Sequence, residues 1–511
     1  MRSVNKGGAT REGGRAYHAF SRREFLKAAG LGAGALVLGG CGALTSQDRP
    51  TGGARTTGGG RVTEYSLETA PMEFELGGRR LQTWGYNGGV PGPEIRIKQG
   101  EALRVRVDNR LPEGTTIHWH GQPIVNDMDG VPDVTQPPIG SGEQFTYDFV
   151  VPAAGTYFYH SHVGLQLDRG VYGPLIVEPE NETLSYDKEF TLMLDDWLDG
   201  VDGRTPEDEL DNLRSGGSEM AGMDMGGGGM EGMGGTEGAD GEPARTPPDT
   251  IYPYHLINGK PPERPEELEV RRGDRVRLRL INASSATIYR VALAGHKLTA
   301  THTDGQPVEQ VEVDVVRLGP GERYDVLVDA TSPGVWQLAA EAEGTEKLAR
   351  AVFRYRGSSG SAPAPDQMPS ELKGNLLTYD MLRAAPEAEP VPEGEPDETI
   401  PLALDGDEEK YTWSINGQRS PDADRISVNR DDLIRFEYRN MSEMPHPMHL
   451  HGHFFRVDNG TGNGPVKDTV LVEPMQTLAT DWLADNPGAW ALHCHLLYHQ
   501  EGGMMRVVDV G

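Results

Sequence analysis

Residues 86–111 read YNGGVPGPEIRIKQGEALRVRVDNRL, and the chain repeats this pattern twice more. The later copies are INGKPPERPEELEVRRGDRVRLRLINAS at 257–284 and INGQRSPDADRISVNRDDLIRFEYRNMS at 415–442. Each copy opens with Asn-Gly, and each closes with an alternating run that ends in Asn, at positions 109, 282 and 440. Alternation with a period of two residues predicts a strand with one buried face. Three copies of such a unit predict three related β-barrels or β-sandwiches.

The composition fits this all-β interpretation. The chain has 511 residues, of which 36% are hydrophobic, so it can form several cores. Its 67 glycines and 37 prolines favour turn-rich β structure over long helices. We expect the three domains at 62–182, 187–357 and 372–511, and we call them the first, middle and third repeats.

The formal net charge is −30 at pH 7. Because nucleic acid phosphates require Lys and Arg, this charge argues against a nucleic acid partner. It is compatible with the attraction of cations, and equally with solubility alone.

The N-terminal segment is typical of an export signal, which we place at 1–41. Arg22 and Arg23 precede an apolar run at about 28–38 that is too short to span a bilayer comfortably. Paired arginines before such a run indicate export of a folded protein by the twin-arginine machinery. The sequence LGGC, which ends at Cys41, resembles a bacterial lipoprotein signal in which that cysteine is lipidated.

A lipidated Cys41 would hold the protein on the outer face of the membrane, in the cell envelope, with 42–61 as a flexible tether. The alternative is a cleaved signal and a soluble periplasmic or secreted protein. With Cys41 lipidated, Cys494 is the only remaining thiol. An unpaired cysteine in an exported protein needs protection, and a bound metal would provide it.

Four His-X-His pairs occur in the outer repeats. They are His118/His120, His160/His162, His449/His451 and His493/His495. In the first and third repeats the pairs begin at matching places, nine residues after the closing Asn and five after a glycine. The middle repeat has Val291 and Ala339 at these places, and so no ligands. Because residues two apart on a strand point to the same side, we expect eight imidazoles in one site shared by the outer repeats.

Cys494 lies between two of these histidines, so its side chain should point to the opposite face, into the third repeat. There it can meet His446, His499 and Met504. Two His, one Cys and a weakly bound Met describe a type 1 blue-copper electron-transfer site. The imidazole pairs alone do not choose among copper, zinc, iron and nickel, but this adjacent site favours copper. One copper there and three among the imidazoles would hold the four electrons that reduce dioxygen to two waters.

The motifs HWHG, HSH, HPMHLHGH and HCHLLYHQEGGMM, in this order, resemble the four signatures of laccase-type multicopper oxidases with three cupredoxin-like Greek-key domains. The likeness spans roughly residues 62–511 and implies four copper ions. The implied type 1 ligands are His446, Cys494, His499 and Met504, and the implied type 2 ligands are His118 and His449. The implied type 3 ligands are His120, His160 and His495 for one copper, and His162, His451 and His493 for the other. Copper-free relatives exist, but every implied ligand position is filled here.

Acidic residues near the motifs are candidates for proton delivery. Asp129 matches the acid that follows HWHG in the family and is implied to donate protons to the cluster; the alternative is a turn aspartate beside Gly130. Many relatives have an acid directly after the last histidine of the final motif, but here that residue is Gln500, and Glu501 follows it. Glu501 is therefore our candidate for a second proton path. His453 matches no ligand, so we expect a supporting or structural role.

A glycine-rich insertion at about 200–250 in the middle repeat contains SEMAGMDMGGGGMEGMGG. Thioethers are soft ligands that suit Cu(I), so this segment predicts Cu(I) capture. The alternative is a low-complexity loop without function. The methionines are Met220, Met223, Met225, Met230 and Met233. Exported, lipid-anchored multicopper oxidases with such loops resemble bacterial copper-tolerance enzymes, particularly those of actinobacteria.

Three functions follow from these observations. We favour a metallo-oxidase that oxidises Cu(I) or Fe(II) with dioxygen in copper tolerance. A laccase that oxidises phenols or aromatic amines is the first alternative, and it would need an open groove beside His499. A copper-buffering protein without enzymatic activity is the second.

Overall fold

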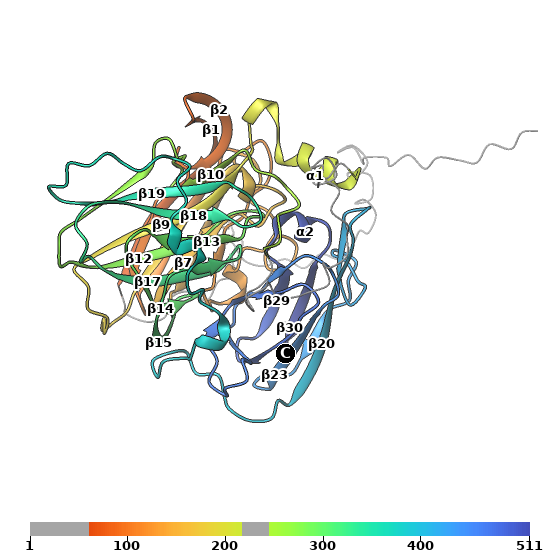
Figure 1. Ribbon diagram of the computed structural model, residues 1–511. Helices are drawn as coiled ribbons and strands as arrows, with labels where there is room; N and C mark the ends of the chain where they lie inside the picture. The colour runs from red at the N-terminus through yellow and green to blue at the C-terminus, as the bar shows by residue number, and fades with distance from the viewer. Residues whose placement is uncertain (1–60, 217–244) are drawn as a thin grey trace, which may run out of the picture. The chain divides into compact units, whose positions relative to one another are not determined.

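The computed structural model of the protein describes residues 61–216 and 245–511, and almost all of their regular structure is β-strand (Figure 1). The described residues all belong to one compact unit, residues 52–511. Their strands form six sheets. The all-β prediction is therefore confirmed.

The strands of the first repeat form two four-stranded sheets. One sheet runs, in spatial order, β2 (Arg79–Tyr86), β1 (Val62–Leu76), β4 (Ala102–Asn109) and β6 (Gln144–Val150). The other runs β3 (Ile95–Lys98), β8 (Tyr172–Glu178), β7 (Gly155–His160) and β5 (His118–His120).

The strands of the middle repeat form a six-stranded and a five-stranded sheet. The larger runs β10 (Tyr254–Ile257), β9 (Lys188–Trp197), β12 (Arg275–Asn282), β17 (Arg323–Asp329), β14 (Leu298–Thr303) and β15 (Gln306–Val313). The smaller runs β11 (Glu266–Val270), β19 (Leu348–Tyr355), β18 (Val335–Ala342), β13 (Tyr289–Leu293) and β16 (Val316–Leu318).

The third repeat has the same division into six and five strands. The larger sheet runs β21 (Thr412–Ile415), β20 (Glu398–Asp407), β23 (Leu433–Asn440), β28 (Thr477–Leu483), β25 (Phe455–Val457) and β26 (Val466–Lys467). The smaller runs β22 (Ile426–Val428), β30 (Met505–Val510), β29 (Gly488–Cys494), β24 (His446–Leu450) and β27 (Thr469–Val472).

The three pairs of sheets share one topology. In each repeat the first strand pairs in parallel with the alternating strand that the sequence identified, as β1 with β4, β9 with β12 and β20 with β23. The second sheets keep the same order, β3-β8-β7-β5, β11-β19-β18-β13 and β22-β30-β29-β24. The sequence repeat is therefore a structural repeat.

The opening asparagine of each copy explains why the motif recurs. Asn87, Asn258 and Asn416 have φ between 51° and 56°, a left-handed conformation that Asn tolerates well. Each side-chain oxygen accepts a backbone N–H of the first strand at 2.7–2.8 Å. Each side-chain amide donates to a carbonyl two residues before that N–H at 2.9–3.0 Å. The residue therefore fixes the end of one strand to its neighbour.

The closing asparagines, Asn109, Asn282 and Asn440, are almost completely buried. Each side-chain oxygen accepts the backbone N–H of the residue two positions later at 2.9–3.0 Å. Each amide donates to a carbonyl four or five residues later and to another on a distant segment. An apolar side chain could not satisfy these buried groups.

The strand register differs by one residue from the sequence alignment in the middle repeat. In the outer repeats His118 lies opposite His160, and His449 lies opposite His493. The equivalent residue of β13, Val291, lies opposite Ala340 rather than Ala339. The middle strand β18 also begins one residue after its glycine, whereas β7 and β29 begin at theirs.

Within residues 61–216 and 245–511, helices are few and short. The α-helices are α1 (Pro206–Arg214) and α2 (Leu497–Glu501), and short 3₁₀ helices are η2 (Asn126–Met128), η3 (Leu167–Arg169), η4 (Val201–Gly203), η6 (Ser370–Lys373) and η7 (Tyr379–Met381). Thr205 caps α1 by accepting the backbone N–H of Asp208, and Pro206 occupies its first turn. In the described part of the chain, no helix is both long enough and apolar enough to cross a membrane.

Candidate metal centre

The four histidine pairs lie on two matching pairs of strands. In the first repeat they lie on β5 and at the end of β7, and in the third repeat they lie at the ends of β24 and β29. Both members of the first pair are within β5, whereas the second member of every other pair lies just beyond its strand. All eight histidines are at most 5% exposed.

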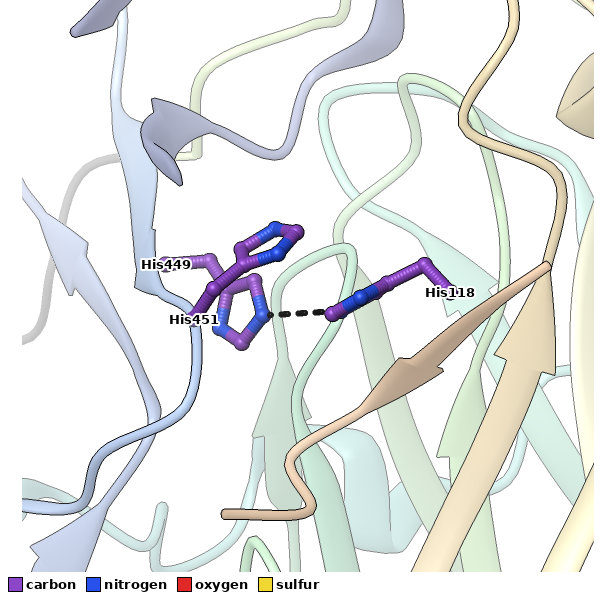
Figure 2. Close-up of side chains that lie close together, drawn as sticks. All are labelled: His118, His449 and His451. Carbon is purple, nitrogen blue, oxygen red and sulfur yellow. Dashed lines mark hydrogen bonds between the residues drawn. The ribbon is translucent and has the colours of Figure 1, made fainter. Parts of the chain in front are cut away.

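The outer repeats meet at these histidines. Nε2 of His118 lies 3.5 Å from Nε2 of His449, so rings from the two repeats face each other (Figure 2). The ring of His451 stacks on His118 with 3.7 Å between centroids. We call the eight buried histidines at this junction the histidine cluster.

Two other groups of histidines lie within the histidine cluster. Nε2 of His493 is 3.1 Å from Nε2 of His451 and 3.5 Å from Nε2 of His162. The ring of His495 lies 4.9 Å from that of His120 and 5.4 Å from that of His160, between centroids. Each group therefore combines histidines from both outer repeats.

Several ring nitrogens in the histidine cluster have no hydrogen-bond partner among the described residues. They are Nδ1 of His120, Nε2 of His160 and both nitrogens of His495. A buried polar atom left unpaired costs about 1–3 kcal/mol. A transition-metal ion bound here would accept these converging lone pairs, and imidazole is a ligand that suits copper.

Four Nδ1 atoms of the histidine cluster have backbone carbonyls as partners. Nδ1 of His118 donates to the Asp129 carbonyl at 2.9 Å, and Nδ1 of His449 donates to the Asp468 carbonyl at 2.8 Å. His160 and His493 likewise donate Nδ1–H to the carbonyl of the next residue, at 2.9 and 3.0 Å. These bonds orient the rings and leave the opposite nitrogen as the acceptor.

Burial keeps seven of the imidazoles uncharged. It is the largest cause that lowers the pKa of seven members of the histidine cluster, and repulsion between neighbouring imidazoles adds to it in each case. The seven are His120, His160, His162, His449, His451, His493 and His495. A neutral imidazole is the form that binds metal, so the site is ready for a cation without the loss of protons.

The Cys494 side chain lies in a second group, inside the third repeat. Its Sγ is 3.6 Å from Nδ1 of His446 and 3.8 Å from Nδ1 of His499, and those two nitrogens are 3.2 Å apart. Met504 is fully buried, and its backbone bonds to both Cys494 and His499 place it beside them. Burial raises the pKa of the Cys494 thiol, so a cation is needed to stabilise the thiolate.

The far nitrogens of the two imidazoles in this second group are also held. Nε2 of His446 hydrogen-bonds with the Ser442 hydroxyl at 2.8 Å. Nε2 of His499 donates to the carboxylate of Asp249 at 3.2 Å. Tyr411 donates its hydroxyl to that same carboxylate. Asp249 comes from the middle repeat, so two repeats build the surroundings of His499.

Trp413 closes one side of His499. Its ring stacks on the imidazole with 3.8 Å between centroids and 21° between planes. Both side chains are almost fully buried. This contact excludes water from one face of the imidazole.

Asp129 lies in a turn, and its carboxylate also contacts the histidine cluster. It precedes Gly130, whose φ of 82° places a turn there. Its carboxylate is 1% exposed and reaches into the histidine cluster. Oδ1 lies 3.1 Å from Nδ1 of His118, and Oδ2 lies 2.9 Å from Nδ1 of His451.

A small cavity of about 10 Å³ adjoins the histidine cluster, about the room that one water molecule needs. Its lining includes His160, His162, His495 and Gln500. Glu501, the candidate from the sequence, is not among the lining residues in the described part of the chain. Its pKa is raised mainly by burial, and the nearby Arg214 opposes that shift.

His453 lies behind the histidine cluster. Its Nδ1 donates to the His451 carbonyl at 3.1 Å, and its ring packs edge-on against Trp482 and Trp490. This packing agrees with the supporting role that we expected.

Sequence reasoning missed Asp249, Asp468 and Ser442. Asp249 and Asp468 contact implied ligands only through the fold, and Ser442, the last residue of the third copy of the repeat, was given no role there. Two further predictions, for Cys41 and for the methionine-rich segment, lie outside the described residues. The methionines concerned are Met220, Met223, Met225, Met230 and Met233.

Comparison with known proteins identifies the class to which this fold and these buried donor groups belong. Family models described as multicopper oxidase match residues 69–182, 188–358 and 394–511. The chain belongs to the multicopper oxidase family. It is therefore an oxidoreductase whose family uses copper, and its domains are cupredoxin-like.

Similar proteins extend over nearly the whole chain. Multicopper oxidase MmcO of Mycobacterium tuberculosis is 39% identical over 508 residues, which is 96% of this chain and 98% of that protein. Copper resistance protein A of Pseudomonas syringae pv. tomato is 30% identical, covering 96% of this chain and 99% of that protein. The crystal structure of a multi-copper oxidase from Pseudomonas thermotolerans has a TM-score of 0.67 and 30% identity, covering 88% of this chain and all of that one.

Proposed function

We propose that the protein holds four copper ions, one at Cys494 and three in the histidine cluster. The type 1 ligands would be Cys494 Sγ, Nδ1 of His446, Nδ1 of His499 and the Met504 thioether. His118 and His449, whose Nε2 atoms face each other, would hold the type 2 copper. The type 3 ligands would be His120, His160 and His495 for one copper, and His162, His451 and His493 for the other. The unpartnered nitrogens of the histidine cluster support this assignment.

The copper ions, when bound, would supply the one-electron steps between an external reductant and dioxygen. The chain provides the connection between the two sites. Cys494 is joined through the backbone to His493 and His495, so its thiolate is covalently linked to ligands of the histidine cluster. Asp129 would deliver protons at its carboxylate, because it is buried and contacts His118 and His451 directly.

We propose that the reductant is a metal cation, Cu(I) or Fe(II), that approaches His499. The observation that carries this proposal is the Asp249 carboxylate, which accepts the outer N–H of His499 and is 15% exposed. A cation bound at Asp249 would therefore be one hydrogen bond from an implied ligand of the type 1 copper.

A further carboxylate, that of Glu408, lies near Asp249. The pKa of Glu408 is raised by partial burial and by the negative charge of Glu443; nearby His499 opposes this shift, and Asp249 adds to it. Glu408 and Glu443 are both exposed, and the charges of Asp249 and His499 act on Glu408, so acids from two repeats act together near His499. The exposed thioether of Met441 lies two residues before Glu443 and suits Cu(I). Carboxylates attract a cation and give no advantage to a neutral phenol.

Oxygen uptake measured side by side with Cu(I), Fe(II) and a phenol tests this proposal. In wild type we expect faster uptake with the metal ions. Asp249→Asn, which keeps the shape of the side chain, should lower kcat/KM for Cu(I) at least tenfold and change phenol turnover little. Glu395→Gln is the matched control, because it removes a carboxylate elsewhere in the third repeat. Equal losses for Cu(I) and the phenol would favour the laccase alternative, and no oxygen uptake with any reductant would favour a copper buffer.

We further propose that the protein is exported and anchored by a lipid on Cys41, which lies outside the described residues. The pattern LGGC after the paired arginines supports this placement. Radioactive palmitate should label the wild type and not Cys41→Ser. An unlabelled wild type would leave a soluble exported protein.

A further inference from the structure

The middle repeat carries none of the implied copper ligands, yet its turn at 319–323 lies directly against them. Gly321, with φ of 86°, is in this turn. A Cβ at Gly321 would lie 2.9 Å from Cδ2 of His495 and 3.1 Å from Cε1 of His120. The bare backbone of the turn therefore forms a wall against two rings of the histidine cluster.

The same turn leads into a buried arginine. Arg323 begins β17 and is fully buried. Its Nη1 and Nη2 donate to the two carboxylate oxygens of Asp468 at 2.7 and 2.5 Å. Its Nε donates to the Thr156 carbonyl at 3.1 Å. The guanidinium thus joins all three repeats, and its paired bonds hold the carboxylate in one orientation.

Asp468, held in this orientation by Arg323, contacts the histidine cluster directly. Its Oδ1 lies 3.2 Å from Nε2 of His120. The hydroxyl oxygen of Thr469 lies at the same distance from that nitrogen. The Thr469 hydroxyl donates its proton to Asp468 Oδ1 at 2.8 Å, so toward His120 it can only accept. Both neighbours of Nε2 are therefore acceptors, and Nε2 must carry the hydrogen. The lone pair of the neutral ring is then on Nδ1, the atom that has no partner in the described residues.

The glycine of HWHG belongs to the same arrangement. Gly121 has φ of 83°, and a Cβ there would lie 2.4 Å from Asp468 Oδ2 and 2.5 Å from Arg323 Nη2. The ion pair therefore packs against the backbone that follows His120. Any other residue would displace the pair from the ring.

We propose that the turn at 319–323 of the middle repeat positions His120 for copper. Arg323, acting through Asp468, fixes the Nε2–H tautomer of His120 and so makes Nδ1 the ligand atom. Gly321 lets the turn close against His120 and His495. This inference rests on the copper sites proposed above.

The tautomer can be read in copper-free protein labelled with ¹⁵N-histidine. Long-range ¹H–¹⁵N correlations report which ring nitrogen carries hydrogen, and the loss of a signal in His120→Gln assigns His120. We expect only Nε2–H in wild type and a substantial share of Nδ1–H in Arg323→Met. Arg279→Met is the control, because Arg279 is buried in the same repeat and also donates to Thr156. An unchanged tautomer in Arg323→Met would overturn the proposal.

A second pair of variants tests the turn without the loss of a buried charge. Gly321→Ala places a methyl group against the two rings. Gly273→Ala imposes the same kind of strain at φ of 93° but meets nothing within 4 Å. We expect Gly273→Ala to bind as much copper as wild type, and Gly321→Ala to lose at least one ion and keep its blue absorption.

Copper content equal in the two glycine variants would contradict the proposed role of the turn. A wild-type protein that binds copper only at Cys494 would overturn the histidine-cluster assignment itself, together with this inference. The number of copper ions per chain, measured by mass spectrometry, and the blue absorption of the same sample distinguish these two outcomes.

Discussion

Replacement of Asn440 by Ala should be the most damaging of three equivalent substitutions at the closing asparagines. Its Nδ2 donates to the carbonyls of Met444, Val472 and Glu473 at 2.7, 3.1 and 3.0 Å. Its Oδ1 accepts the backbone N–H and the hydroxyl of Ser442, both at 2.9 Å. At about 1 kcal/mol net for each lost hydrogen bond, the cost is about 3–5 kcal/mol.

Asn109→Ala is the matched comparison, because the side chain of Asn109 makes three such bonds. We expect it to cost about 2–3 kcal/mol. Asn440 also holds Ser442, which hydrogen-bonds His446. Asn440→Ala should therefore weaken the blue absorption of copper-loaded protein, whereas Asn109→Ala should not.

Urea unfolding of the copper-free variants gives the free energies, and visible absorption of the loaded protein gives the second readout. A loss below about 1 kcal/mol for Asn440→Ala would show that the buried groups find other partners. An equal loss of blue absorption in Asn109→Ala would refute the specific link from Asn440 through Ser442 to His446.

Three other predictions concern single residues. Cys494→Ser should abolish the intense blue absorption, and a blue variant would refute the type 1 assignment. Trp413→Ala should destabilise the protein by about 3 kcal/mol in urea unfolding, because it removes a buried ring and exposes His499. The blue absorption should then be lost at a lower urea concentration than in wild type. An unchanged midpoint of urea unfolding would contradict the packing argument. Burial, with a smaller effect of Lys347, lowers the pKa of His255 from 6.5 to about 3. Since the unfolded chain alone binds that proton, the free energy of unfolding should fall by up to about 1.4 kcal/mol per unit as pH drops from 6.5 toward 3. Copper-free His255→Gln should show a shallower fall, and an identical slope would refute a buried neutral His255.

The sequence predicted best those structural features that all three repeats share. The opening and closing asparagines appear three times because each repeat must satisfy the same buried backbone groups. The alternating strands between them gave the fold class for the same reason. The sequence alignment matched Ala339 to His160 and His493, whereas in the structure Ala340 is the residue opposite Val291.

The histidine pairs were also visible, since two donors on one side of a strand require a fixed spacing. Their surroundings were not. Asp249 lies at the end of a long insertion, and Asp468 and Arg323 come from different repeats, so only the folded chain brings them beside ligand residues. Gln500 was noticed as a departure from the family pattern, but its place beside the histidine cluster came from the cavity that it lines.

Anomalous X-ray diffraction at the copper absorption edge, from crystals of the copper-loaded protein, tests the proposed sites most directly. We predict one peak between Cys494 and the Nδ1 atoms of His446 and His499, and three peaks within the histidine cluster. One of these three should lie against Nδ1 of His120. An empty histidine cluster, or copper bound at Nε2 of His120, would contradict the account.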